Sequence, residues 1–178
     1  MTDVLLVIDV QRALLDELAP PRRAELVETL VYLLNGARST GVPVVYVRHD
    51  GSPTELIPGT PEWEIASEVA PRAAEAIVDK RSGDAFTQTT LRDVLAALDA
   101  DHLIVSGMQT DFCVNATIGG AVGRGYRVTL VADGHATSAS NGKSEQQIRE
   151  AMHTQTRARG VGIISAAGLY GRLEEGRR

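Results

Sequence analysis

The sequence contains few cysteines, no long apolar run and no excess of basic residues. Its 178 residues include one cysteine, so no disulfide can form within the chain, and a reducing compartment is the simpler expectation. No stretch approaches the roughly 20 apolar residues that a membrane span needs. The formal net charge of -5 disfavours nucleic acid and anionic membranes as main partners, because both reward basic patches. We therefore expect a cytoplasmic protein that folds as one domain over residues 1–178.

Short apolar runs rich in β-branched residues alternate with longer segments of helical periodicity. The runs cover residues 4–8, 43–47, 76–78, 102–106, 126–131 and 161–164. The helical segments cover residues 22–39, 89–98, 113–124 and 144–158. Runs that are apolar throughout are typical of strands buried on both faces, as in a parallel sheet. The pattern predicts an α/β protein, a three-layer α/β/α sandwich.

Polar residues follow several of these predicted strands. Asp9 follows the first, Lys80 the third, Cys113 lies in the segment after the fourth, and His135 comes after the fifth. Ligands of open α/β sheets bind beyond the carboxyl ends of the strands, so we expect a site there. The irregular segment 49–75 is longer than an ordinary connection, which favours a functional loop.

Cys113 is the most informative of these residues. Thr110 or Asp111 can cap a helix that starts there, which would place Cys113 in the first turn and favour its thiolate. A nearby Lys80 would favour the thiolate further, and Asp9 could accept the thiol proton, which together supply the parts for covalent acyl transfer. The alternatives are that Cys113 is a small buried hydrophobic residue, that Asp9 caps a helix or binds a metal, and that Lys80 is a solvated loop lysine.

Three motifs together resemble the isochorismatase-like cysteine hydrolases. They are Asp-Val-Gln at residues 9–11, Lys80, and Gly-x-x-Thr-Asp-x-Cys-Val at residues 107–114. That family includes isochorismatase, nicotinamidase and N-carbamoylsarcosine amidohydrolase, and the resemblance covers about residues 3–165. It implies a six-stranded parallel sheet in the order 3-2-1-4-5-6 and a catalytic triad of Asp9, Lys80 and Cys113.

The resemblance also implies the details of the chemistry. A cis peptide is expected between Met108 and Gln109, with the backbone N–H groups of Gln109 and Cys113 forming an oxyanion hole. Asp9 would take the proton of Cys113, the thiolate would attack a carbonyl, and water would hydrolyse the resulting thioester.

Candidate substrate contacts are drawn from the same comparison. Leu14 stands where the family often has Phe, and Trp63, Phe86, Gln109 and His135 are the other candidate walls. Trp63 and Phe86 could equally serve in core or lid packing, and His135 could simply cap a turn.

A metal site is not expected. Nicotinamidases of the family hold a metal through an Asp-x-His pair and a later His, whereas His49 and Gly51 stand at the places of that pair here. Since a metal usually needs three or four protein ligands, we expect no catalytic metal and no cofactor, and nicotinamide becomes a less suitable substrate.

The leading functional prediction is hydrolysis of a C–N bond in a small amide, carbamoyl compound or lactam-like molecule. One alternative is hydrolysis of a vinyl ether, as isochorismatase performs. An alternative of another class is a redox-sensing or binding module that uses Cys113 without turnover. The resemblance implies a homo-oligomer, a dimer or tetramer, and leaves open whether residues 49–75 form a lid or complete a neighbouring subunit's site.

Overall fold

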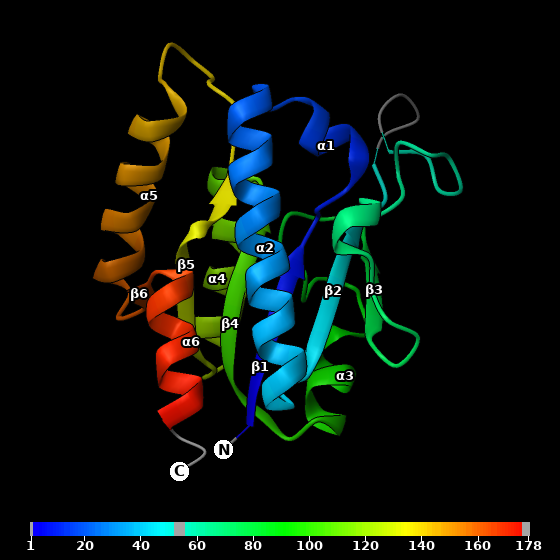
Figure 1. Ribbon diagram of the computed structural model, residues 1–178, viewed down its shortest axis with the longest axis vertical. Coiled ribbons are helices and arrows are strands. Elements are labelled where there is room, and N and C mark those ends of the chain that lie inside the picture. The colour runs from blue at the N-terminus through cyan, green and yellow to red at the C-terminus, as the bar shows by residue number, and fades with distance from the viewer. Residues whose placement is uncertain (1, 52–55, 176–178) are drawn as a thin grey trace.

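The computed structural model describes residues 2–51 and 56–175, and their strands form one parallel sheet covered by helices on both faces (Figure 1). Its order is β3-β2-β1-β4-β5-β6, which confirms the predicted fold class and strand order. The strands are β1 (Thr2–Ile8), β2 (Val44–His49), β3 (Ala76–Lys80), β4 (Ala100–Met108), β5 (Arg127–Ala136) and β6 (Gly162–Ile164).

The structure contains the predicted helices and further ones, including one near each end of the chain. They are α1 (Arg12–Asp16), α2 (Pro20–Thr40), α3 (Leu91–Ala97), α4 (Asn115–Gly123), α5 (Glu145–Ala158) and α6 (Ala166–Glu175), with a 3-10 helix η1 (Ser67–Val69) and a π-helix η2 (Thr110–Val114). The short α1 and η1, as well as α6, were not predicted. Among the described residues, no helix combines the length and the apolar character that a membrane crossing requires.

The two faces of the sheet each pack against their own set of helices. Leu5 and Val7 of β1 join the apolar cluster under α2 and α6, whereas Val4, Leu6 and Ile8 join the cluster that includes side chains of α3, α4 and α5. Successive side chains of a strand point to opposite faces, so a strand covered on both sides must be apolar at every position. This explains why residues 4–8 form an unbroken apolar run.

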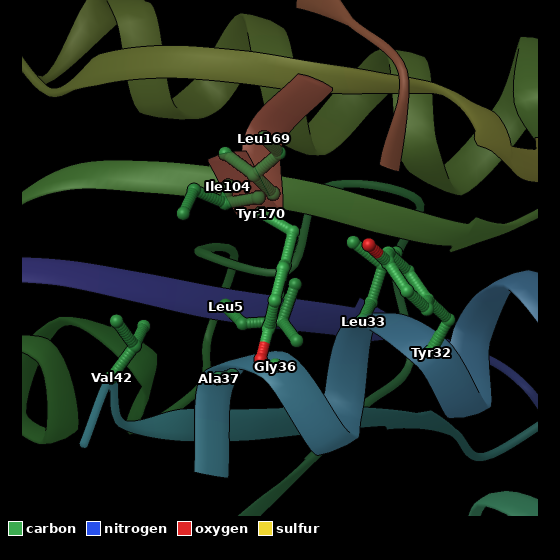
Figure 2. A pocket seen from close by; sticks show the side chains of 9 residues that line it. All are labelled: Leu5, Tyr32, Leu33, Gly36, Ala37, Val42, Ile104, Leu169 and Tyr170. Carbon is green, nitrogen blue, oxygen red and sulfur yellow. The ribbon is translucent and has the colours of Figure 1, made fainter. Parts of the chain in front are cut away.

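Helix α6 packs against α2, and Figure 2 shows the side chains of both helices that line the pocket between them. The ring of Tyr170 lies against Gly36 of α2, where an added Cβ would come within 2.5 Å of the ring. Leu33 and Leu169 line the narrow apolar crevice between the two helices. This crevice contains none of the predicted site residues, so it belongs to the packing of the fold.

Strands β2, β3, β4 and β5 all extend further towards their carboxyl ends than the sequence pattern indicated. Lys80 is the last residue of β3 and pairs with His49 of β2, so it belongs to the sheet. The prediction that His135 follows the fifth strand is wrong, because β5 continues to Ala136. After a register shift, β5 resumes its pairing with β4, where Gly107 is opposite His135, and this renewed pairing keeps the polar stretch around His135 in the strand.

The carboxyl ends of β1 and β4 approach each other unusually closely at Gly107. Its φ is 117°, a conformation that glycine tolerates and other residues rarely adopt. A Cβ at this position would overlap the carbonyl oxygen of Ile8 and lie 2.6 Å from the Ile8 nitrogen. The segment that starts at Ile8 and the segment that leads to Cys113 are therefore held side by side.

Replacement of Gly107 by Ala should destabilise the protein strongly, because the new methyl group meets backbone atoms that cannot move independently. We expect the free energy of unfolding to fall by at least about 2 kcal/mol, measured by urea denaturation.

Gly123→Ala is the matched control, since nothing lies within 4 Å of a Cβ at this helical position. It should change the free energy of unfolding by less than about 1 kcal/mol, in the stabilising direction. Equal stability of the two variants would contradict the close approach of β1 and β4.

Candidate active site

Asp9 is the first residue after β1 and is almost completely buried. Its side chain is 1% exposed, and its Oδ2 lies 2.8 Å from Nζ of Lys80. The backbone has φ 49°, in the left-handed region that non-glycine residues seldom occupy. Such conformations cost free energy and cluster at functional sites. The strained turn directs a carboxylate into the interior at the edge where the strands end.

Lys80 reaches this carboxylate across the end of the intervening strand β2. Its side chain is 0% exposed, and its Nζ lies 2.8 Å from Asp9 Oδ2, 2.8 Å from Nδ1 of His49 and 3.1 Å from Sγ of Cys113. The alternative of a solvated loop lysine is therefore wrong. The ammonium group joins three side chains that come from three different segments of the chain.

Cys113 lies in the π-helix η2 and is partly exposed. The predicted side-chain cap by Thr110 or Asp111 is wrong: Gln109 occupies the capping position, and no side chain caps the helix. Thr110 is instead hydrogen-bonded to His135, and the carboxylate of Asp111 accepts a hydrogen bond from Thr137. The peptide bond between Met108 and Gln109 is cis. The Sγ of this partly exposed residue lies 3.1 Å from Nζ of Lys80.

Burial dominates the protonation of the site. The pKa of the Cys113 thiol is raised to about 12, first by burial and then by the negative charge of Asp9, against the opposing charge of Lys80. Burial also raises the pKa of Asp9, and Lys80 partly offsets this. Burial therefore opposes the thiolate that the start of a helix was expected to favour, and the resting site holds a neutral thiol.

His49 and Gln11 are parts of the site whose roles the sequence analysis missed. Gln11 is 0% exposed; its side-chain oxygen accepts from the N–H of His49 at 2.9 Å, and its Nε2 donates to the carbonyl of His49 at 2.9 Å. The same Nε2 donates to the carbonyl of Trp63 at 2.8 Å. The strand order contained a signal: β2 lies between β1 and β3, so its last residue must lie between Asp9 and Lys80.

The described residues do not fit a metal of the nicotinamidase kind. Ligand atoms of Asp9, His49 and Cys113 do lie within 4.8 Å of one another. However, the Lys80 ammonium contacts all three, and its positive charge opposes a second cation at that point. Gly51 offers no side-chain ligand.

Three of the predicted substrate contacts lie after the carboxyl ends of strands: Leu14 after β1, Trp63 after β2 and Gln109 after β4. Leu14 of α1 is partly buried against the α2 side of the core. Trp63 is 8% exposed; its Nε1 donates to Asp50 at 3.0 Å, and the guanidinium of Arg48 lies 3.4 Å from its ring centre. The amide of Gln109 donates to Glu17 at 2.7 Å.

The two remaining predicted contacts point into the interior. Phe86 stacks on Tyr126, with ring centres 5.7 Å apart, and belongs to the core. His135 is 0% exposed and lies 2.8 Å from Thr110 and 2.9 Å from His153. By contrast Phe112, which immediately precedes Cys113, is 59% exposed, and the sequence analysis did not single it out.

Known proteins are similar to this chain in sequence, and solved structures are similar to it in fold. A streptothricin hydrolase from Streptomyces noursei is 38% identical over 75% of this chain and 54% of its own length. An N-carbamoylsarcosine amidase from Arthrobacter is 29% identical over 60% of this chain and 48% of its own length. The chain therefore spans about half the length of these curated relatives.

Solved structures agree over nearly the whole chain. An isochorismatase from Pseudomonas putida KT2440 superposes with a TM-score of 0.84 at 29% identity, covering 93% of this chain and 88% of that one. A cysteine hydrolase from Pseudomonas syringae pv. phaseolicola superposes with a TM-score of 0.85 at 26% identity, covering 97% and 92%. The model of the isochorismatase domain matches residues 3–167. The chain belongs to the isochorismatase family of hydrolases.

Proposed function

We propose that the protein hydrolyses a C–N bond of a small amide, carbamoyl or lactam-like molecule through a thioester on Cys113. The observation that carries this proposal is the contact of the Lys80 ammonium with both Asp9 and Cys113 at the carboxyl edge of the sheet. A nucleophile, a base and a cation within direct reach are what covalent acyl transfer requires. A cytoplasmic location and a homo-oligomeric state remain parts of the proposal.

In the first half of the reaction, Asp9 accepts the thiol proton as sulfur attacks the substrate carbonyl. The raised pKa of Asp9 makes this transfer easier than it would be to an ordinary carboxylate. The carbonyl oxygen takes up the negative charge and is stabilised by the backbone N–H groups of Gln109 and Cys113. Protonated Asp9 then gives its proton to the leaving nitrogen as the C–N bond breaks, which leaves a thioester on Cys113.

In the second half, water attacks the thioester, and Asp9 again accepts a proton. The C–S bond breaks, and the proton returns from Asp9 to sulfur, so the resting thiol is restored. Lys80 keeps its charge throughout and compensates whichever of its neighbours is negative. The site needs no change of redox state and no external proton donor other than water.

The relatives favour C–N cleavage over vinyl ether hydrolysis. N-carbamoylsarcosine amidase, nicotinamidase and maleamate amidohydrolase act, by their names, on amide-type bonds, and streptothricin hydrolase is named for the hydrolysis of streptothricin. The chain spans only part of several of these proteins, so their names do not assign its substrate. A substrate panel is needed to identify it.

A panel of streptothricin, N-carbamoylsarcosine, maleamate, nicotinamide and isochorismate should reveal release of ammonia or amine from an amide. Cys113→Ser and Asp9→Asn should each lower kcat/KM by at least about 10³-fold, since removal of a nucleophile or its base disables the covalent route. Cys113→Ser should keep the melting temperature of the wild type within a few degrees, whereas Asp9→Asn should lower it, because Lys80 loses its buried counter-charge.

Two results would contradict this proposal. Release of pyruvate from isochorismate, without amide cleavage, would assign vinyl ether chemistry. Modification of Cys113 by a mild electrophile, without turnover of any compound in the panel, would favour a thiol-sensing module.

Labelling of Cys113 by iodoacetamide should increase towards alkaline pH, because its pKa is raised to about 12. The negative charge of Asp9 contributes to this elevation, so Asp9→Asn should move the labelling curve to lower pH and, at pH 8, accelerate labelling by at least about tenfold. Intact-protein mass spectrometry gives the rates directly, since the chain has one cysteine.

Asp111→Asn is the control for this measurement, because it removes a nearby carboxylate that is hydrogen-bonded to Thr137. Its labelling curve should coincide with that of the wild type. Slower labelling of Asp9→Asn than of the wild type at every pH would disprove the electrostatic relation between the two groups.

A further inference from the structure

The ammonium group of Lys80 is surrounded by polar atoms of the protein, with hydrogen bonds to His49 and Cys113 and an ion pair with Asp9. An ammonium group carries three N–H donors and no acceptor. Its three polar neighbours are Asp9 Oδ2 at 2.8 Å, His49 Nδ1 at 2.8 Å and Cys113 Sγ at 3.1 Å. The side chain is 0% exposed, so the described structure gives water no access to it. The direction of each N–H therefore depends on the other two acceptors.

The contact with His49 fixes the state of its ring. Since the ammonium can only donate, Nδ1 must accept, and the ring proton must lie on Nε2. Burial, followed by the charge of Lys80, lowers the pKa of His49, while the negative charges of Asp9 and Asp50 partly oppose this. A neutral imidazole is thus the form compatible with this geometry at neutral pH.

The backbone of His49 is also hydrogen-bonded within the protein. Gln11 bonds both the N–H and the carbonyl of His49, and it follows Asp9 by two residues. Register pairing places His49 directly beside Lys80 on the neighbouring strand. His49 is consequently held by the segment that follows β1 and by β3, although it makes no hydrogen bond to Asp9 or Cys113.

We propose that His49 is a positioning residue, whose neutral imidazole occupies one N–H of Lys80 and thereby directs the other two to Asp9 and Cys113. The inference rests on the proposed role of Cys113 as nucleophile. It goes beyond the triad, because His49 touches neither the substrate carbonyl nor the sulfur in this scheme. It also gives a role to a residue at the place where nicotinamidases have a metal ligand.

Acylation of Cys113 by p-nitrophenyl acetate tests this role without knowledge of the natural substrate. The burst of p-nitrophenolate should be at least about tenfold slower in His49→Ala, the size expected for loss of one hydrogen bond to a charged group. His49→Asn offers an amide oxygen to Lys80 and should remain within about threefold of the wild type. His102→Asn should match the wild type, since His102 is bonded to Asp3 and Thr129 at the start of β4.

A spectroscopic measurement provides a readout that depends neither on the His49 variants nor on turnover. Two-dimensional ¹H–¹⁵N spectra of the histidine rings should show His49 of the wild type as the Nε2–H tautomer at pH 7.5. In Lys80→Met, the midpoint of His49 titration should move to higher pH, because the nearby positive charge is removed.

The inference is overturned if His49→Ala is acylated as fast as the wild type, or if His49→Ala and His49→Asn are equally slow. An Nδ1–H tautomer in the wild type would overturn it as well. The proposed function fails separately: a panel without turnover, combined with the expected tautomer and acylation rates, rejects amide hydrolysis and leaves the positioning of Lys80 intact.

Discussion

The buried ammonium group of Lys80 is the interaction on which the site depends. Removal of a charge from water is costly, and a buried ion pair is tolerated only when its geometry and its remaining hydrogen bonds compensate. Here the compensation comes from one carboxylate, one imidazole and one sulfur, each within 3.1 Å of the same nitrogen. These three groups come from the ends of β1 and β2 and from η2. The contacts of the Lys80 ammonium group therefore link four segments at the carboxyl edge of the sheet.

The sheet order supplies the distances that this arrangement needs. Strand β1 lies between β2 and β4, and β2 separates it from β3. Asp9 therefore meets the segment of Cys113 directly, whereas Lys80 must cross β2, and a four-carbon side chain is long enough to do so. The close approach at Gly107 keeps β1 and β4 in contact up to the point where the two segments diverge. The positive φ of Asp9 occurs at this same point, directly after β1.

The protonation state of the site follows from its burial rather than from the start of a helix. Cys113 lies in a π-helical turn, and burial together with Asp9 raises its pKa, so the sulfur is at rest as a thiol. The positive end of a helix would favour the opposite state. The same burial raises the pKa of Asp9.

The sequence by itself determined the layers and the polar residues at the strand ends, and its resemblance to the isochorismatase family implied the strand order and the triad. Apolar runs report burial on both faces, and parallel strands bring their carboxyl ends to one edge, so Asp9, Lys80 and Cys113 could be expected there. Only the tertiary structure decided the rest: the continuation of β5 through His135, the burial of Phe86, the π-helical turn and the contact between His49 and Lys80. These features depend on register and on desolvation, which arise when distant segments pack and leave no local periodicity in the chain.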